Sequence, residues 1–286
     1  MMGWKKKSLM ILGVSLLISA IIWCQMGMYI THLLFGVDIP TNFFKFCISL
    51  FRENSFYYFL ITILLNVLIA YSILITLYKI IEQYVLSKKF QKKMLKLKNK
   101  EWTESVMTKA EGQNKDILVI NHDQLLAFSM GFRRPMIVLS SGLIRLLDDQ
   151  ELEAVIEHEA SHQQNYDSLW VFILKLISES LWFIPMTKWS YHNYKIISEL
   201  LADEYAIRQT GSEIGLGSAL LKLIKNCCRD DSTPVLVHFS EEAVNYRLKQ
   251  LIEPQKKIPV KPAFTSMVVS VYGLILFMGM IFLAIT

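Results

Sequence analysis

Three apolar runs of membrane-spanning length constrain the fold of this chain more than any other feature. They cover residues 8–30, 56–80 and 263–285. A helix rises about 1.5 Å per residue, so roughly 20 apolar residues cross the hydrocarbon core of a bilayer. Hydrophobic residues make up 53% of the sequence and its mean hydropathy is +0.35, which is too apolar for an ordinary soluble enzyme. We therefore predict a mostly helical membrane protein.

The lysines beside these runs predict how the chain is oriented. Residues 5–7 are all lysine and no small-x-small cleavage site follows, which favours an uncleaved span with its N-terminus in the cytoplasm. A lysine cluster at residues 88–100 follows the second span, so we expect it at the cytoplasmic face, against anionic lipid rather than nucleic acid. Lysines 256, 257 and 261 precede the third span, which puts the C-terminus outside.

A short polar stretch, Val155-Ile-Glu-His158-Glu159-Ala-Ser-His162, carries the residues best suited to chemistry. Residues four apart share one face of a helix, so His158 and His162 present two imidazoles to one point. Zinc binds neutral histidine nitrogens and needs more than two protein ligands. Glu159 lies at the rim of the same face, where a carboxylate can take a proton from an attacking water. The alternative is a chance match on a polar helix.

The residues around this stretch favour the zinc interpretation. Asp148 and Glu151 form a capping box that predicts the start of a helix. A second predicted helix, over 189–209, carries Glu199 and Asp203 four residues apart on one face. Glu199 is the candidate third ligand, and Asp203 can accept the free N–H of a ligand histidine and so orient its ring.

Taken together, His158-Glu-x-x-His162 and Glu199-x-x-Ala-Asp203 resemble the metal motifs of a gluzincin. Residues 127–139 and the stretch 181–185 resemble the BlaR/MecR antibiotic-sensor family of membrane metallopeptidases. The resemblance covers roughly residues 115–250, and Ste-type and Htp-type membrane peptidases share the two metal helices. BlaR/MecR sensors continue into an extracellular penicillin-binding domain, whereas this sequence stops at Thr286, so we do not expect direct beta-lactam sensing.

The resemblance implies a zinc metalloendopeptidase that acts in signal transduction by cleaving a cytoplasmic transcriptional repressor, or itself. It leaves two alternatives, a membrane quality-control peptidase of the Htp or Ste type and a non-catalytic zinc-bound signalling scaffold. The expected partners are a protein substrate and membrane lipid, with no direct contact to nucleic acid. A homo-oligomer or a partner membrane protein stays open.

The resemblance also extends to a late segment in which a histidine and an arginine approach the metal. Here these residues are His238 and Arg247, and either one, or Tyr205, could stabilise the oxyanion of the tetrahedral intermediate. The alternative for Arg247 is an ion pair with Asp203 or another carboxylate. The sequence leaves both roles open.

A small sheet is predicted before the first metal helix. The runs 117–120, 125–130 and 136–139 are predicted strands, and a short helix over 143–147 follows them. A sheet beside a zinc helix often offers an edge to an extended substrate, although a purely structural sheet would have the same pattern.

The apolar stretch 168–187 is long enough to span, but a single crossing would place Glu199 on the opposite side of the membrane from His158. Lys175 and Glu179 form an i,i+4 pair that would be costly in lipid. We therefore predict a helix that lies in the cytoplasmic interface or dips into it, and turns back near Pro185.

These expectations give a multi-pass cell-membrane protein in three parts. Residues 1–87 form a membrane region with spans at 8–30 and 56–80. Residues 88–262 form a cytoplasmic α+β gluzincin-type zinc peptidase domain, and 263–286 form the last span. The cysteines form no C-x-x-C pair, so neither a zinc knuckle nor a redox motif is expected. Cys24 and Cys47 could pair near the outer face, although free buried cysteines are the commoner case.

Overall fold

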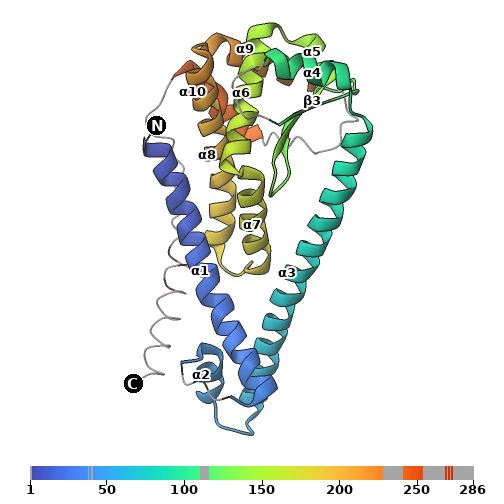
Figure 1. Ribbon diagram of the computed structural model, residues 1–286. Coiled ribbons are helices and arrows are strands. Elements are labelled where there is room, and N and C mark those ends of the chain that lie inside the picture. The colour runs from blue at the N-terminus through green and yellow to red at the C-terminus, as the bar shows by residue number, and fades with distance from the viewer. Residues whose placement is uncertain are drawn as a thin grey trace. The chain divides into compact units, whose positions relative to one another are not determined.

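The structure, a computed structural model, describes residues 2–37, 39, 41–109, 116–227, 241–253, 268, 270 and 272. Most of the predicted span 263–286, as well as His238, lies outside these residues. The elements in chain order (Figure 1) are α1 (Met2–Phe35), α2 (Phe43–Ser49), α3 (Phe56–Lys96), α4 (Lys100–Lys109), β1 (Ile117–Ile120), β2 (Ala127–Met130), β3 (Met136–Ser140), α5 (Ser141–Leu146), α6 (Asp149–Asn165), α7 (Asp167–Ser180), α8 (Pro185–Thr210), α9 (Glu213–Cys227) and α10 (Glu241–Ile252).

The chain divides into two compact units. One, which we call the sheet unit, comprises Met1–Ser8, Gln83–Phe172 and Asn193–Pro259. The other, which we call the helical unit, comprises Leu9–Glu82, Ile173–His192 and Val260–Thr286. The long helices α1, α3, α7 and α8 run from one unit into the other.

Among the described residues, two helices are long and apolar enough to cross a membrane, Trp4–Phe35 and Phe56–Lys96. They contain the predicted spans 8–30 and 56–80. Along α3, apolar side chains such as Phe59, Ile63 and Val67 are exposed, which suits a surface that faces lipid rather than water. The helix continues without a break beyond the apolar run, as the spacing of its later apolar residues suggests.

Residues 31–55, between the first two predicted spans, are only partly a loop. Helix α1 extends to Phe35, and α2 begins after Asn42, whose side chain accepts a hydrogen bond from the Lys45 backbone N–H. The Asn42 amide also donates to the Gln25 carbonyl at 3.0 Å, which holds this cap against α1. Within the described residues Cys24 and Cys47 are free cysteines, so the possible disulfide is not formed.

The predicted helix over 168–187 ends earlier than expected, and the chain turns just before Pro185, as predicted. Helix α7 ends at Ser180, and α8 begins at Pro185, where a missing N–H has no cost because the first N–H groups of a helix lack partners. Ile177 and Leu181 are fully buried in a cluster with Ile18, Ile22, Ile69 and other apolar residues of the helical unit. The turn between α7 and α8 thus packs against α1 and α3 within the helical unit.

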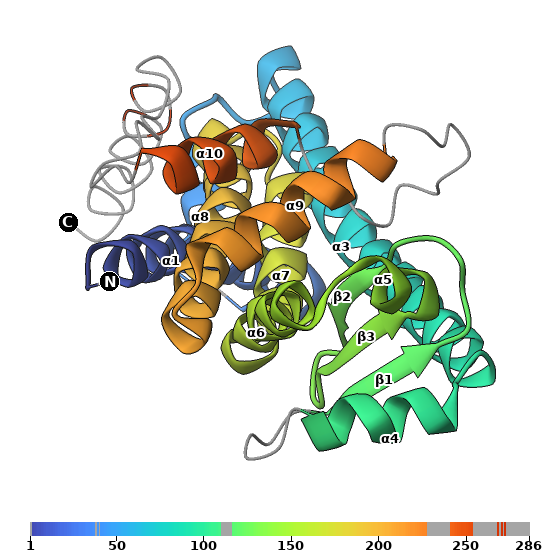
Figure 2. The same ribbon diagram turned by 90° about the horizontal axis from the view of Figure 1, so that it is seen from above.

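The sheet unit contains the three predicted strands, in the order β1-β3-β2. β1 pairs with β3 in parallel and β2 pairs with β3 antiparallel, so β2 is an edge strand. Gly131, with a φ of 110°, makes the turn after β2, a backbone conformation that other residues rarely adopt. Figure 2 shows α4 beside β1 and α6 beside β2.

Helix α6 forms the other half of this unit's core. Val155 and Ile156 pack in one buried cluster with Ile137 and Leu139 of β3. The capping box predicted at its start is present, with Asp148 as N-cap and Glu151 at the third position. Buried Glu151 also accepts hydrogen bonds from Ser218 Oγ at 2.5 Å and Lys222 Nζ at 2.6 Å, which tie α6 to α9.

Candidate metal centre

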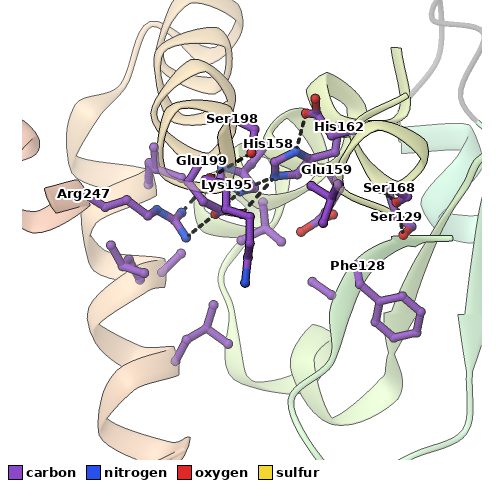
Figure 3. A pocket seen from close by; sticks show the side chains of 18 of the residues that line it. Phe128, Ser129, His158, Glu159, His162, Ser168, Lys195, Ser198, Glu199 and Arg247 are labelled. Carbon is purple, nitrogen blue, oxygen red and sulfur yellow. Dashed lines mark hydrogen bonds and ion pairs between the residues drawn. The ribbon is translucent and has the colours of Figure 1, made fainter. Parts of the chain in front are cut away.

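Two imidazoles and one carboxylate converge in the sheet unit (Figure 3). His158 and His162 lie one turn apart on α6, and Glu199 projects toward them from α8. The two Nε2 atoms are 3.2 Å apart. Glu199 Oε2 lies 3.5 Å from His158 Nε2, and Glu199 Oε1 lies 3.6 Å from His162 Nε2. Within the described residues this is the group of three donors able to hold a metal ion.

The spacing of these donors fits zinc. In a tetrahedral site with metal–ligand distances of about 2.0–2.1 Å, neighbouring donor atoms lie about 3.3 Å apart. The three observed spacings fall close to this value. Four carboxylates and one guanidinium surround the histidines, and this surplus of negative charge favours a bound cation. The residues present therefore fit the metal that the motif implies.

Asp203 lies behind the first histidine. Its Oδ1 accepts a hydrogen bond from His158 Nδ1 at 2.9 Å, so the opposite ring nitrogen faces the donor group. Arg247, on α10, donates to both Asp203 oxygens, from Nε at 2.8 Å and Nη2 at 2.7 Å. Its Nη1 also donates to Glu199 Oε2 at 3.2 Å. These contacts are those expected if Arg247 forms ion pairs with carboxylates. Arg247 thereby connects Glu199, a candidate ligand, to Asp203, which orients the candidate ligand His158.

Asp167 occupies the equivalent place behind the second histidine. Its Oδ2 accepts from His162 Nδ1 at 2.8 Å, and its Oδ1 accepts from the Tyr194 hydroxyl at 2.8 Å. Sequence analysis missed both residues. The available signal was the position of Asp167 five residues after His162, but an acidic residue in the first turn of a helix is common for reasons of helix electrostatics alone.

The charges of the site act on one another strongly. Burial lowers the pKa of His162, but Asp167, Glu199 and Glu159 outweigh it and raise that pKa to about 10. Burial and Arg247 lower the pKa of His158, and Asp203 and Glu199 more than offset this, so its pKa is raised. Burial raises the pKa of Glu199, but the two histidines and Arg247 hold it well below its usual range. Both histidines thus hold protons tightly in the protein alone.

The sequence profile of the family described as BlaR1 peptidase M56 matches residues 54–251. This chain belongs to the M56 peptidase family. The match includes all three donors, Glu159 and Arg247, so the group described above lies within the peptidase region. Together with the two long apolar helices, the family indicates association with a membrane. No curated protein matches the chain.

In this M56 peptidase the donors open onto a cavity of about 300 Å³. Glu159 is on its wall, next to the two histidines, and none of the described residues forms a hydrogen bond with its carboxylate (Figure 3). Ala127, Phe128 and Ser129 of the edge strand line the cavity as well. The remaining wall is mostly aliphatic and includes Val155, Leu216, Ala219, Leu220 and Leu223. A candidate base, three candidate ligands and a strand edge that pairs with no other described strand therefore line one cavity.

The two other residues considered for the oxyanion role in this M56 peptidase are Tyr205 and His238. Tyr205 packs against the core of the sheet unit, and its hydroxyl accepts a hydrogen bond from Gln164 Nε2 at 2.9 Å. It is not among the residues that line the described cavity, which disfavours the oxyanion role considered for it. His238 lies outside the described residues.

Proposed function

We propose that this M56 peptidase is a zinc-dependent endopeptidase of the cell membrane. The observation that carries the proposal is the triangle of His158, His162 and Glu199, whose donor atoms have the spacing of a zinc site, with Glu159 on the wall of the same cavity. A closed structural zinc site has four protein ligands and no use for such a base. Three donors beside an open cavity are typical of a catalytic site.

Each residue then has a defined part in peptide hydrolysis. When bound, a zinc ion supplies the Lewis acid that polarises the scissile carbonyl and acidifies the attacking water. Glu159 takes the proton from that water as it attacks, and passes it to the nitrogen of the leaving amine. Asp203 keeps the proton of His158 on Nδ1, so that Nε2 is free to bind the cation. Arg247 holds Asp203 and Glu199 in place.

The free edge of β2 is the proposed binding site for an extended substrate. In an antiparallel pair, alternate residues direct their backbone groups toward the partner strand and away from it. The Ser140 N–H donates to Leu126 O, and Phe128 is two residues further along β2. Ala127 and Ser129 therefore direct their N–H and C=O groups to the free edge. Ser168 Oγ already donates to the Ser129 carbonyl at 3.2 Å, which agrees with this assignment.

The proposed biological role is signal transduction. The family description names a BlaR1 peptidase, and the chain's resemblance to BlaR/MecR sensors suggests cleavage of a cytoplasmic transcriptional repressor, or of the peptidase itself. The lysine cluster at 88–100 supports a cytoplasmic position for the peptidase region. Zinc, a protein substrate and membrane lipid are the proposed partners.

Replacing the base tests the proposal. Glu159→Gln removes the proton acceptor and keeps the shape of the side chain, so we expect proteolysis to be abolished while zinc still binds. The measurement compares the proteomes of cells that produce the wild type or this variant, and determines the zinc content of both proteins. Glu153→Gln is the matched control, because Glu153 is exposed on the same helix.

The outcomes separate the alternatives. Loss of one or a few cleavage products, a repressor fragment among them, supports the signalling role. Loss of many fragments from membrane proteins would indicate a quality-control peptidase. If the biological output persists in Glu159→Gln, the protein acts as a zinc-bound scaffold and not as a peptidase.

A further inference from the structure

A buried hydrogen-bond chain leads away from the second histidine and ends on the helix that carries Glu199. It runs from His162 Nδ1 to Asp167 Oδ2, and from Asp167 Oδ1 to the Tyr194 hydroxyl, at 2.8 Å each. Asp167 is 7% exposed and Tyr194 is 4% exposed, so water does not compete for these contacts. We propose that Asp167 and Tyr194 are positioning residues that orient His162 toward the metal. This rests on the proposed metal centre.

The geometry gives Asp167 a defined task. A neutral imidazole has one proton, and a carboxylate at Nδ1 keeps the proton there and leaves the Nε2 lone pair for the metal. His162 Nε2 is the atom that faces His158 and Glu199. Asp167 also follows His162 closely in the sequence. Tyr166 ends α6 in the left-handed conformation (φ 54°), and α7 begins at Asp167. The sharp turn thus brings the carboxylate back against the ring.

The geometry gives Tyr194 a different task. Tyr194 lies on α8, five residues before Glu199. Helix α8 therefore supplies both a candidate ligand and the hydroxyl that donates to Asp167, the hydrogen-bond partner of His162. The phenol stabilises one Asp167 oxygen without neutralising the carboxylate, whereas Asp203 behind His158 faces the charged Arg247. Tyr194 also forms a hydrogen bond with Ser8 in the first turns of α1. This hydroxyl therefore ties α8, which carries Glu199, to the first residue of α7.

Zinc affinity and cobalt spectra test the proposal in the full-length protein purified in detergent. The variants are Tyr194→Phe and Asp167→Asn. Tyr205→Phe is the matched control, since it also removes a hydrogen-bonded hydroxyl from α8 but touches none of the donors. Loss of an outer partner of a ligand histidine typically weakens metal binding by about 10–100-fold. We expect that loss for Asp167→Asn, a smaller loss of about threefold to tenfold for Tyr194→Phe, and wild-type affinity for Tyr205→Phe.

Substituted cobalt reports coordination directly, because its visible absorption depends on ligand geometry. We expect the Co²⁺ bands of both positioning variants to shift, and those of Tyr205→Phe to match the wild type. A role confined to folding would lower thermal stability in chelator without changing the spectrum of the folded protein. If Tyr194→Phe and Asp167→Asn bind zinc and cobalt as the wild type does, the inference is wrong and the proposed metal centre stands. If the wild type itself binds neither metal, both fail. Should Asp167→Asn not fold, Tyr194→Phe decides alone.

Discussion

At the scale of single residues, the two histidines of the site differ in what surrounds the carboxylate that each one contacts. His158 is backed by a carboxylate paired with a guanidinium, and His162 by a carboxylate that receives a neutral phenol. Both arrangements place the imidazole proton on Nδ1. The pKa of both histidines is raised, that of His162 to about 10.

The raised pKa of the two histidines predicts that protons compete with the metal. Zinc binds the neutral imidazole, so at pH 7 a proton held by a group with a pKa of about 10 must leave as zinc binds. We expect each bound zinc ion to displace at least one proton. For every proton displaced, zinc affinity should then increase about tenfold for each pH unit between pH 6 and 8. Chelator competition at several pH values, with calorimetry in two buffers, measures both. An affinity that does not change with pH would contradict the raised pKa.

The sequence predicted some of these residues and could not predict others. His158, His162, Glu199 and Asp203 are found because i,i+4 spacing on a helix puts side chains on one face. Asp167 approaches His162 through the turn at Tyr166, and its position five residues after His162 is too common a pattern to predict this contact. Tyr194 approaches Asp167 through the packing of α8, which no local spacing encodes. The position of Arg247 depends in the same way on where α10 packs.

At the scale of elements, the edge strand is the feature that should control substrate binding. Ser129 directs its backbone N–H to the free edge and not to β3, so a proline there removes a donor without breaking the ladder. We predict that Ser129→Pro raises KM for a protein or peptide substrate by about tenfold or more, since a lost hydrogen bond with a buried partner costs roughly 1–3 kcal/mol. Steady-state cleavage assays measure KM and kcat separately.

One companion variant of Ser129→Pro separates the role of the backbone from that of the side chain. Ser129→Ala keeps the N–H and loses only the hydroxyl contact with Ser168, so its KM should stay near the wild-type value. Zinc content and thermal stability should stay near wild type in both variants. An unchanged KM in Ser129→Pro would show that the substrate does not pair with β2.

The elements also show where sequence patterns stop being informative. The strands and the capped start of α6 were predicted because short apolar runs bounded by turn residues, and helix caps, are local signals. The stretch 168–187 was predicted as a helix that turns back near Pro185, and the turn is found there. The end of α7 at Ser180 was not predicted, because hydropathy does not show where a helix ends within an apolar stretch. The short α2 was missed because its cap, Asn42, depends on contacts with Gln25, which is distant in the sequence.

At the scale of the whole molecule, the prediction concerns the side of the membrane. All three candidate ligands lie in the sheet unit, with the lysine-rich end of α3, so we propose that they face the cytoplasm. In a cysteine-free background, Glu53→Cys should react with an impermeant thiol reagent added to intact cells. Glu104→Cys should react only after the membrane is opened; both positions are exposed. Labelling of Glu104→Cys in intact cells would place the peptidase region outside.

The most direct test of the central claim is the metal content of the purified protein. We predict about one zinc ion per chain after purification in detergent without added metal, and a large loss of zinc in Glu199→Gln, because the amide is a much poorer ligand than the carboxylate. Glu153→Gln should retain the wild-type content. A wild-type protein without zinc, or a Glu199→Gln variant that keeps its full complement, would contradict the claim that His158, His162 and Glu199 bind one metal ion.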